Sequence, residues 1–305
     1  MLWTELADRL ARDIAGGRWG DGDRLPGVRP LARQAGCSPA TAARAYAALR
    51  DAGVIGGAPR ERFTVAPHGS ARAAAWGTKA TSLLVAGSDD PALDLLIRAA
   101  GGSVSAAPGA RGSVQGLAHL ARGTADAAAV HLLDTATGEW NDSFARGALA
   151  GAPALLVHLW RREQGLVLQP GNPKGIRGVE DLAQARVAWR PAGTGSRLLL
   201  ERLMLLEGAE PRPELGVAAD THLAVATAVA AGAADAGLAV RAVAEPLGLD
   251  WIPVATESFE LAMGAESRSA AEPLLEILAT GEVHSRLAGM PGYDVAMSGE
   301  TRLAA

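Results

Sequence analysis

The stretch Asp23–Ile55, DRLPGVRPLARQAGCSPATAARAYAALRDAGVI, decides the fold of the N-terminal part of the chain. Residues 31–34 favour a short helix, and Gly36 permits a tight turn after it. Ser38-Pro39 is a strong helix start, because serine caps free backbone amides and proline fits the first helical position. The sequence therefore predicts two helices joined by a tight turn, and the second helix begins at Pro39.

The second predicted helix has an apolar face and a face of small residues. Apolar side chains recur at i, i+3, i+4 and i+7: Ala42, Ala45, Tyr46 and Leu49. The opposite face carries Thr41 and Arg44 among alanines, so it can approach a DNA groove closely. Glycines end this helix, and residues 59–65 are expected to form a turn and a strand. This order predicts a winged helix-turn-helix with its second helix in the major groove.

Three motifs in this region are typical of one family. They are Leu25-Pro26-Gly27-Val28-Arg29, Ser38-Pro39-Ala40-Thr41, and AYAALRDAG from position 45 to position 53. With them, the first 66 residues resemble the GntR family of bacterial transcription regulators. The resemblance implies a DNA interface on this part of the chain. Arg44 is a possible base contact, and the cap residue Ser38 belongs to the interface. The residues expected on phosphates are Arg29, Thr41, Arg60 and Arg62. An ordinary solvated surface is the alternative for these arginines.

The charge is divided unevenly along the chain. Residues 1–70 hold ten arginines, no lysine and seven acidic residues, a charge of about +3, so the remainder carries about −7 of the total of −4. A basic N-terminal part before an acidic body fits a DNA-binding domain joined to one that does not bind DNA. Because the charge is modest, we expect a homodimer that grips a palindromic double-stranded DNA operator.

Several classes of protein are disfavoured by composition. The N-terminus has acidic residues and no continuous apolar run, unlike a signal peptide, and the Ala-rich run of residues 217–240 is broken by charges, unlike a membrane span. We therefore expect a cytoplasmic protein without membrane contact.

Cys37 is the single cysteine, which excludes an intrachain disulfide and a cysteine-cluster metal site, and we expect it to pack in the turn. No cofactor is expected.

Beyond residue 66 the pattern changes twice. Residues 67–80 are rich in Ala, Gly and Ser without apolar periodicity, so we expect a linker. From residue 81 to 305, short apolar runs of strand length alternate with helical segments. This alternation predicts an α/β body with mostly parallel sheets.

Four strand-to-helix junctions of the body share the same chemistry. Each places small hydroxyl residues and free amides at a helix N-terminus, where partial positive charge collects. They are Gly87–Asp90, Gly112-Ser113, Gly193–Ser196 and Asp220–His222. In open α/β sheets the ligand crevice lies at the carboxyl ends of the strands, so the four junctions are expected to converge there. Ordinary helix capping is the alternative for each junction alone.

The body resembles the type II periplasmic-binding-protein fold, and in particular the cytoplasmic domain similar to molybdate-binding proteins that occurs fused to helix-turn-helix heads. The residues that carry this resemblance are 112–134, 162–173, 193–197 and 221–237. The resemblance implies two lobes, lobe I from about 81–155 and 255–305 and lobe II from about 160–250. It places the ligand between them, so that lobe closure couples ligand binding to the DNA-binding heads.

The candidate ligand residues come from these junctions and from one strand end. They are Ser88, Ser113, His131, Thr194, Ser196, Arg197, Thr221 and His222. For Arg197 an ion pair with Glu201 at i+4 is the alternative, and for His131 a buried core position. Asp89 and Asp90 oppose an anion, since carboxylates compete for the same amides, unless they cap the helix or the ligand offers donors.

We therefore expect a ligand-responsive transcription regulator that senses a small oxyanion such as molybdate or tungstate. A small organic metabolite is the alternative ligand. An enzyme or carrier with a vestigial DNA-binding head is the alternative from another class. Catalysis is not expected, because the lysines do not suit a Schiff base and no Gly-x-Ser-x-Gly elbow occurs.

Overall fold

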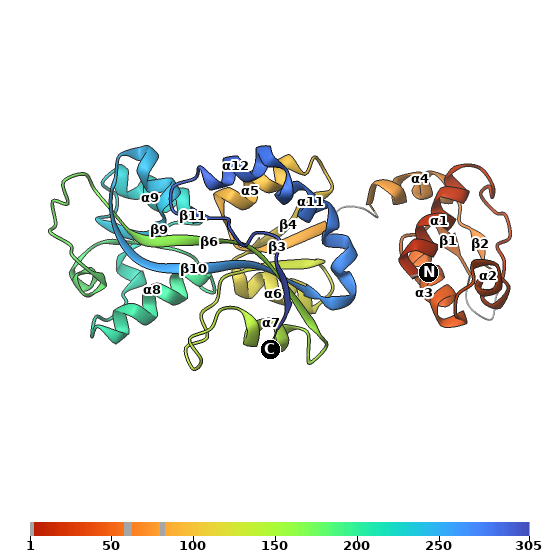
Figure 1. The fold of residues 1–305 in the computed structure, drawn as a ribbon, viewed down its shortest axis with the longest axis horizontal. Helices are drawn as coiled ribbons and strands as arrows, with labels where there is room; N and C mark the ends of the chain where they lie inside the picture. The colour runs from red at the N-terminus through yellow and green to blue at the C-terminus, as the bar shows by residue number, and fades with distance from the viewer. Residues whose placement is uncertain (1–2, 58–62, 80–82, 305) are drawn as a thin grey trace. The chain divides into compact units, whose positions relative to one another are not determined.

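The computed structural model describes residues 3–57, 63–79 and 83–304, which form two compact units divided between Ser82 and Leu83. The first unit is helical, with a two-stranded sheet; the second is a two-lobed α/β body (Figure 1). In the described residues, no helix is both long enough and apolar enough to cross a membrane.

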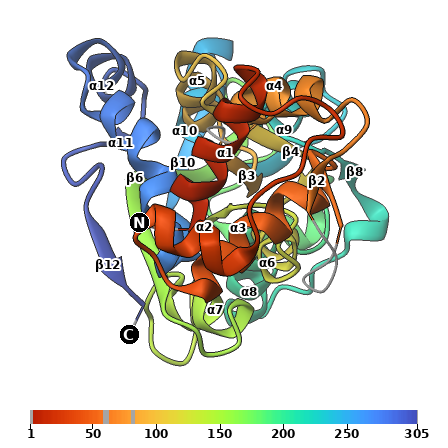
Figure 2. The ribbon, with the colours of Figure 1, turned by 90° about the vertical axis from the view of Figure 1, so that its right-hand side faces the viewer.

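The first unit combines helices with a small two-stranded sheet (Figure 2). Its elements are α1 (Trp3–Ala15), α2 (Val28–Ala35), α3 (Pro39–Asp51), β1 (Ile55–Gly56), β2 (Thr64–Val65) and α4 (Gly69–Lys79). Gly36 ends α2 in the left-handed conformation, with φ 64°, and α3 starts at Pro39, as the sequence predicts. The four inward residues of α3 are fully buried against α1 and α2, and β1 pairs antiparallel with β2.

The expected linker is wrong for residues 69–79, which form helix α4 of the first unit. Ala73 is 2% exposed, and the indole Nε1 of Trp76 donates to Asp8 on α1 at 3.0 Å. The carboxylate of Asp21 accepts the backbone N–H of His68 and of Ser70, which fixes the start of the helix. An Ala-rich segment with little apolar periodicity becomes helical here because distant residues cap it and pack against it.

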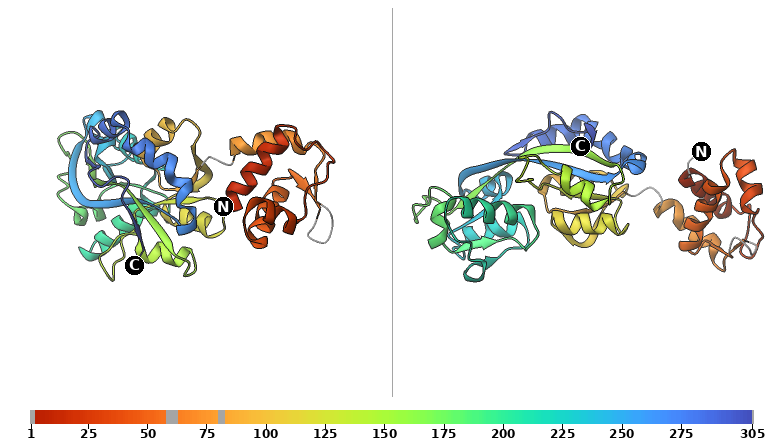
Figure 3. Two further views of the ribbon diagram at one scale, coloured as in Figure 1. Left: turned by 45° about the vertical axis from the view of Figure 1, so that its right-hand side comes forward. Right: turned by 90° about the horizontal axis from the view of Figure 1, so that it is seen from below.

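Two long antiparallel strands cross both lobes of the second unit, β6 (Ala154–Leu168) and β10 (Asp250–Gly264) (Figures 1 and 3). The path through the sheet is β4-β3-β5-β10-β6-β9-β7-β8, with β11 and β12 also paired to β6. The pairs within each lobe, β3 with β4 and β5, and β7 with β8 and β9, are parallel, as expected. The crossing strands make the whole sheet mixed.

Lobe I combines the ends of β6 and β10 with the first and last parts of the body. Its other elements are β3 (Leu83–Gly87), α5 (Pro91–Ala99), β4 (Val104–Arg111), α6 (Ser113–Ala121), β5 (Ala127–Val130), α7 (Asp142–Ala148), η4 (Ala265–Ala271), α11 (Glu272–Ala279), α12 (Gly281–Ala288), β11 (Tyr293–Asp294) and β12 (Thr301–Leu303). Helices α5, α11 and α12 pack on one face of the sheet, and α6 and α7 on the other (Figure 1).

Lobe II holds the opposite ends of the long strands. Its other elements are η1 (Val179–Gln184), β7 (Val187–Trp189), α8 (Gly195–Leu206), η2 (Pro213–Leu215), β8 (Val217–Ala218), α9 (His222–Ala230), β9 (Ala236–Val240), α10 (Arg241–Ala244) and η3 (Glu245–Leu247). Helix α8 packs on one face and α9 with α10 on the other. The strand ends that precede α5 and α6 in lobe I therefore face those that precede α8 and α9 in lobe II.

Candidate functional site

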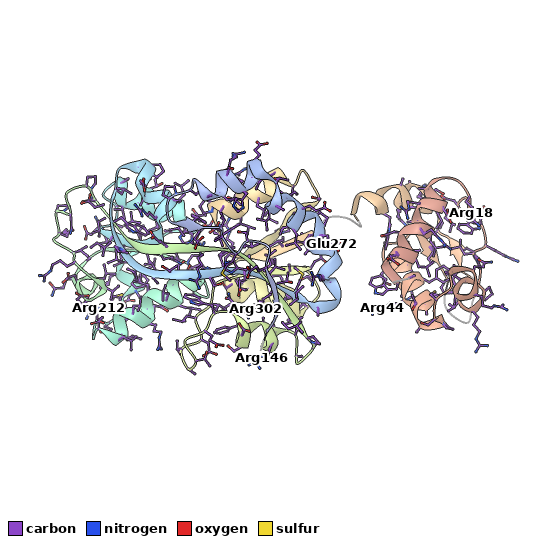
Figure 4. The ribbon with its side chains drawn as sticks, in the orientation of Figure 1. Arg18, Arg44, Arg146, Arg212, Glu272 and Arg302 are labelled. Carbon is purple, nitrogen blue, oxygen red and sulfur yellow. The ribbon has the colours of Figure 1, made fainter. Side chains whose placement is uncertain are left out.

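Helix α3 presents the candidate DNA contacts of the first unit. The hydroxyl oxygen of Ser38 accepts the N–H of Thr41 at 3.1 Å, so Ser38 caps the helix. Arg44 is exposed, and its guanidinium carbon lies 5.0 Å from the ring centre of Trp3 (Figure 4). Arg29 on α2 is also exposed. Among the described residues neither arginine forms an ion pair, which leaves both charges accessible to phosphate. Arg60 and Arg62 lie outside the described residues.

The four helix junctions of the second unit meet. The hydroxyl oxygens of Ser88 and Ser113 lie 2.8 Å apart, which joins the α5 and α6 junctions. The backbone N–H of Val114 on α6 donates to Gly193 O before α8 at 3.3 Å, and His222 N at the start of α9 donates to Asp89 before α5 at 2.8 Å. The last two bonds connect lobe I to lobe II. The convergence expected from the sequence is therefore present.

Glycine permits this close approach at two places. A side chain on Gly112 would bring its Cβ to 2.9 Å from Thr194 Cγ2, and the φ of Gly112 is 87°. A Cβ on Gly195 would lie 2.5 Å from His131 Cε1. Both distances are too short for carbon atoms, so the junctions depend on the absence of side chains at these positions.

Two junctions are already capped by side chains, and two are not. Asp90 accepts the amides of Ala92 and Leu93 on α5, at 2.7 and 2.9 Å, and Thr221 accepts Ala224 N on α9 at 3.0 Å. Helices α6 and α8 have Gly112 and Thr194 at their N-cap positions, without a side-chain cap. The first turns of α6 and α8 are thus the places where amides could bind an anion, although Val114 N already donates to Gly193 O.

A buried ion-pair network lies beside these junctions. Arg162, in the middle of β6, is completely buried; it donates to Asp90 and, at 3.0 Å, to Glu257 on β10. Tyr293 also donates to Asp90, at 2.9 Å, and His131 Nδ1 lies 3.0 Å from Glu257. Burial lowers the pKa of Arg162, but Glu257 and Asp90 raise it by more. Burial raises the pKa of Glu257, but His131 and Arg162 lower it by more, to about 2. The Arg162–Glu257 pair is therefore ionised at neutral pH.

Several buried polar atoms of this region lack a hydrogen-bond partner among the described residues. They are Arg162 Nη2, Arg190 Nε and Nη1, His222 Nδ1 and Gln164 Oε1. Arg190 is 4% exposed and His222 is 1% exposed. Leaving such groups unpaired in a buried place costs about 1–3 kcal/mol each, and more for a charge. Three of the five atoms are guanidinium nitrogens, which can only donate, so the unmet requirement is mainly for an acceptor.

The second arginine is less well neutralised than the first. Arg190 Nη1 lies 3.4 Å from Asp89 Oδ2, without the geometry of a hydrogen bond. Burial lowers the pKa of Arg190 to about 10, with Asp89 opposing this effect and Arg162 adding to it. Burial also lowers the pKa of His222 well below 6.5, and Arg190 and Arg162 lower it further. An added anion would relieve both effects.

The candidate ligand residues divide into two groups. Ser88, Ser113, His131, Thr194, Ser196 and His222 are all buried at the junctions. Gln164 Nε2 donates to Ser196 Oγ at 2.9 Å, which leaves the Ser196 hydroxyl hydrogen free, whereas Thr194 donates to Pro191 O. Thr221 caps α9 through its side chain. Arg197 forms the alternative ion pair with Glu201, at 2.7 Å, and its guanidinium lies over Trp189, so the structure does not bring it into the group.

Sequence reasoning missed four residues of this site. Arg162, which is buried in the centre of β6, was not among the candidate ligand residues, and neither were Arg190, Gln164 and Glu257. One available signal was the i, i+2 spacing of Arg162 and Gln164 within one strand, which places both on the same face. Nothing local marked Glu257 as the partner of Arg162, because that pairing depends on the register of β6 with β10.

An apolar pocket of about 690 Å³ adjoins the junctions. It lies between α8 and the segment that follows β5, and Trp140, Phe144 and Leu198 contribute to its walls. His131 and Gly195 line it as well, so it shares a wall with the polar group.

Two family models match the chain. Residues 2–65 match the model of bacterial regulatory proteins of the gntR family, and residues 96–279, more than half of the chain, match the model of the PBP superfamily domain. The HTH-type transcriptional regulator SCO4628 of Streptomyces coelicolor is 43% identical over 53 residues, 17% of this chain and 20% of that protein. That match covers less than a fifth of this chain.

A relative and a solved structure resemble the body. The uncharacterized protein YvgK of Bacillus subtilis is 31% identical over 197 residues, which are 63% of this chain and 64% of YvgK, so the match spans just under two thirds of that protein. A putative phosphate ABC transporter substrate-binding protein from Clostridium perfringens, solved with bound phosphate, covers 70% of this chain and 99% of its own, with 13% identity and a TM-score of 0.51. This likeness concerns the fold. The chain belongs to the PBP superfamily domain family and carries at its N-terminus a regulatory domain of the GntR family.

Proposed function

We propose that this protein is a ligand-responsive transcription regulator whose body binds a small oxyanion between its lobes. One observation carries the ligand class: buried guanidinium nitrogens of Arg162 and Arg190 lack acceptors, beside the N-termini of α6 and α8, which have no side-chain cap. A compact tetrahedral anion offers several acceptor oxygens in a small volume, so one molecule can satisfy donors that approach from different directions. Molybdate and tungstate are the first candidates.

Regulation follows from the position of the ligand. The junctions that meet belong to both lobes, so an anion held among them favours the closed arrangement over an open one. The first unit supplies the DNA-binding helix α3, with Arg44 exposed on it. We propose that two copies bind a palindromic operator and that the ligand changes the affinity of this dimer for DNA.

The first experiment measures ligand binding. Purified protein is screened by thermal denaturation with molybdate, tungstate, phosphate and sulfate, because a ligand that binds only the folded state raises the melting temperature. The variant Arg190→Gln removes the buried charge, and we expect it to abolish the shift. Arg111→Gln is the matched control, since Arg111 pairs with Asp220 at 3.2 Å on the exposed edge of the cleft. An equal shift in wild type and Arg190→Gln contradicts the proposed site.

A second experiment measures regulation. Fluorescence anisotropy with operator DNA, identified by selection from a random library, gives the affinity with and without the oxyanion. We expect the ligand to change this affinity and Arg190→Gln to be insensitive to it. If the operator affinity is the same with and without every ligand that binds, the regulatory coupling is contradicted.

The apolar pocket favours a second candidate ligand. Its walls include Trp140 and Phe144, and its volume of about 690 Å³ lies in the range usual for pockets that hold organic molecules. A small organic anion could place its charged group among the arginines and its apolar part in the pocket. The same thermal screen with a panel of carboxylates tests this ligand, and Leu198→Glu would remove a shift that depends on the pocket. Turnover of any such metabolite would instead establish an enzyme.

A further inference from the structure

The carboxylate of Asp89 connects the two lobes. Asp89 stands in the junction between β3 and α5 of lobe I, and among the described residues its side chain contacts His222 N and Arg190, both in lobe II. Its Oδ2 accepts the backbone N–H of His222 at 2.8 Å and lies 3.4 Å from Arg190 Nη1. The Asp89 side chain is 25% exposed, whereas Arg190 is 4% exposed. The carboxylate therefore reaches from the cleft edge toward a buried cation.

These two contacts are those that a bound anion would use. Backbone N–H groups at the start of a helix and an arginine are the usual partners of oxyanions in proteins. The buried nitrogens of Arg190 and His222 that lack partners belong to the same two residues. Asp89 thus supplies one carboxylate to a site whose donors could bind further acceptor oxygens.

Capping of helix α5 does not account for Asp89. The neighbouring Asp90 accepts the amides of Ala92 and Leu93 and also pairs with Arg162. The two adjacent aspartates therefore have separate partners. Asp90 binds the start of α5 and the buried arginine, whereas the side-chain partners of Asp89 among the described residues belong to the opposite lobe.

We infer that Asp89 is an internal competitor of the ligand: its carboxylate occupies part of the anion site, and an oxyanion binds by displacing it from Arg190 and the start of α9. This inference rests on the proposed oxyanion site. It makes Asp89 a residue that lowers affinity and sets the ligand concentration at which the regulator responds.

The balance of charge supports displacement over joint occupancy. Arg162 is paired with Asp90 and Glu257, so its charge is already compensated by two carboxylates. Arg190 has Asp89 as its ion-pair partner. An oxyanion bound beside Asp89 would face three carboxylates and two guanidinium groups in a poorly solvated place, which repels it. When Asp89 turns to solvent, the ligand replaces it as the anion that compensates the charge of Arg190.

The experiment compares oxyanion affinities of wild type, Asp89→Asn and Asp220→Asn by isothermal titration calorimetry with molybdate, tungstate, phosphate and sulfate. Asparagine keeps the shape and an oxygen that can accept His222 N–H, but it removes the charge. Asp220→Asn is the matched control: it also removes one negative charge at the cleft edge, where Asp220 pairs with Arg111. Among the described residues Asp220 forms no hydrogen bond or ion pair with Arg190 or the start of α9, and its charge acts on Arg190 only at longer range. Asp89→Ser is a second variant that lacks the charge. Thermal denaturation of each variant tests whether it folds.

We expect Asp89→Asn and Asp89→Ser to bind the preferred oxyanion at least about tenfold more tightly than wild type, while Asp220→Asn changes affinity less than about threefold. Weaker or equal oxyanion binding by both Asp89 variants overturns the inference and leaves the oxyanion site intact. In that case Asp89 would stabilise lobe closure or accept a hydrogen bond from a donor group of the ligand. Binding by the variants alone supports both proposals. No binding by any of the proteins overturns both.

Discussion

Acid should destabilise the second unit through His222, and the effect can be isolated by one substitution. His222 is 1% exposed, and its pKa is lowered well below 6.5 by burial, then by the charges of Arg190 and Arg162. The folded protein therefore keeps this side chain neutral at a pH where the unfolded chain binds a proton. Because the unfolded state takes up more protons, the free energy of unfolding decreases as the pH falls below about 6.5.

The magnitude follows from the unfolded-state pKa. Between about pH 7.5 and about pH 5.5, one histidine that stays neutral when folded lowers the free energy of unfolding by up to about 1.4 kcal/mol. For a unit of this size that corresponds to a decrease of about 3–6 °C in melting temperature. Burial also lowers the pKa of His131, although Glu257 opposes it, so His131 adds to the decrease in the same direction.

The assay is urea denaturation of unliganded protein at several pH values, followed by tryptophan fluorescence. His222→Gln removes the titrating group, so the difference between wild type and this variant should shrink by about 1.4 kcal/mol as the pH falls across that range. The exposed His284 on α12 provides the control, and His284→Gln should retain the wild-type slope. Parallel pH profiles for wild type and His222→Gln would refute the assignment of a neutral, buried His222.

Three further predictions concern other parts of the chain. Arg44→Ala should weaken operator binding by about 1–3 kcal/mol while leaving oxyanion binding unchanged, measured by anisotropy and calorimetry, and equal operator affinity would remove Arg44 from the interface. Tyr46→Phe removes the hydrogen bond of the buried hydroxyl to Pro26 O at 2.6 Å, so the first unit should lose about 1–3 kcal/mol of unfolding free energy in chemical denaturation; no loss would mean that Pro26 O finds another donor. Gly195→Ala should abolish the oxyanion-dependent thermal shift, because its Cβ would collide with the ring of His131 at 2.5 Å, and a preserved shift would show that the α8 junction tolerates displacement.

Individual junctions illustrate what local sequence can predict. Ser88, Ser113, Thr194 and His222 could be named because a hydroxyl or a turn residue at the start of a helix is a local signal. Their convergence could be expected because parallel strands of an α/β sheet direct their carboxyl ends to one edge. Asp89 and Asp90 look equivalent in the sequence, yet one caps α5 and the other reaches the opposite lobe. That difference depends on the position of α9, more than 130 residues away.

The sequence by itself determined the elements whose stability is local. Gly36 and Ser38-Pro39 set the helix-turn-helix, because left-handed turns and caps depend on a few neighbouring residues. Only the tertiary structure decided that residues 69–79 are a helix, since Asp21 and α1 stabilise it from a distance. It also decided that Arg162 is buried, since Glu257 on β10 and Asp90 at the α5 junction pair with it. A buried charge is tolerable only with its partners in place, and those partners are set by strand register and lobe packing that no short stretch of sequence records.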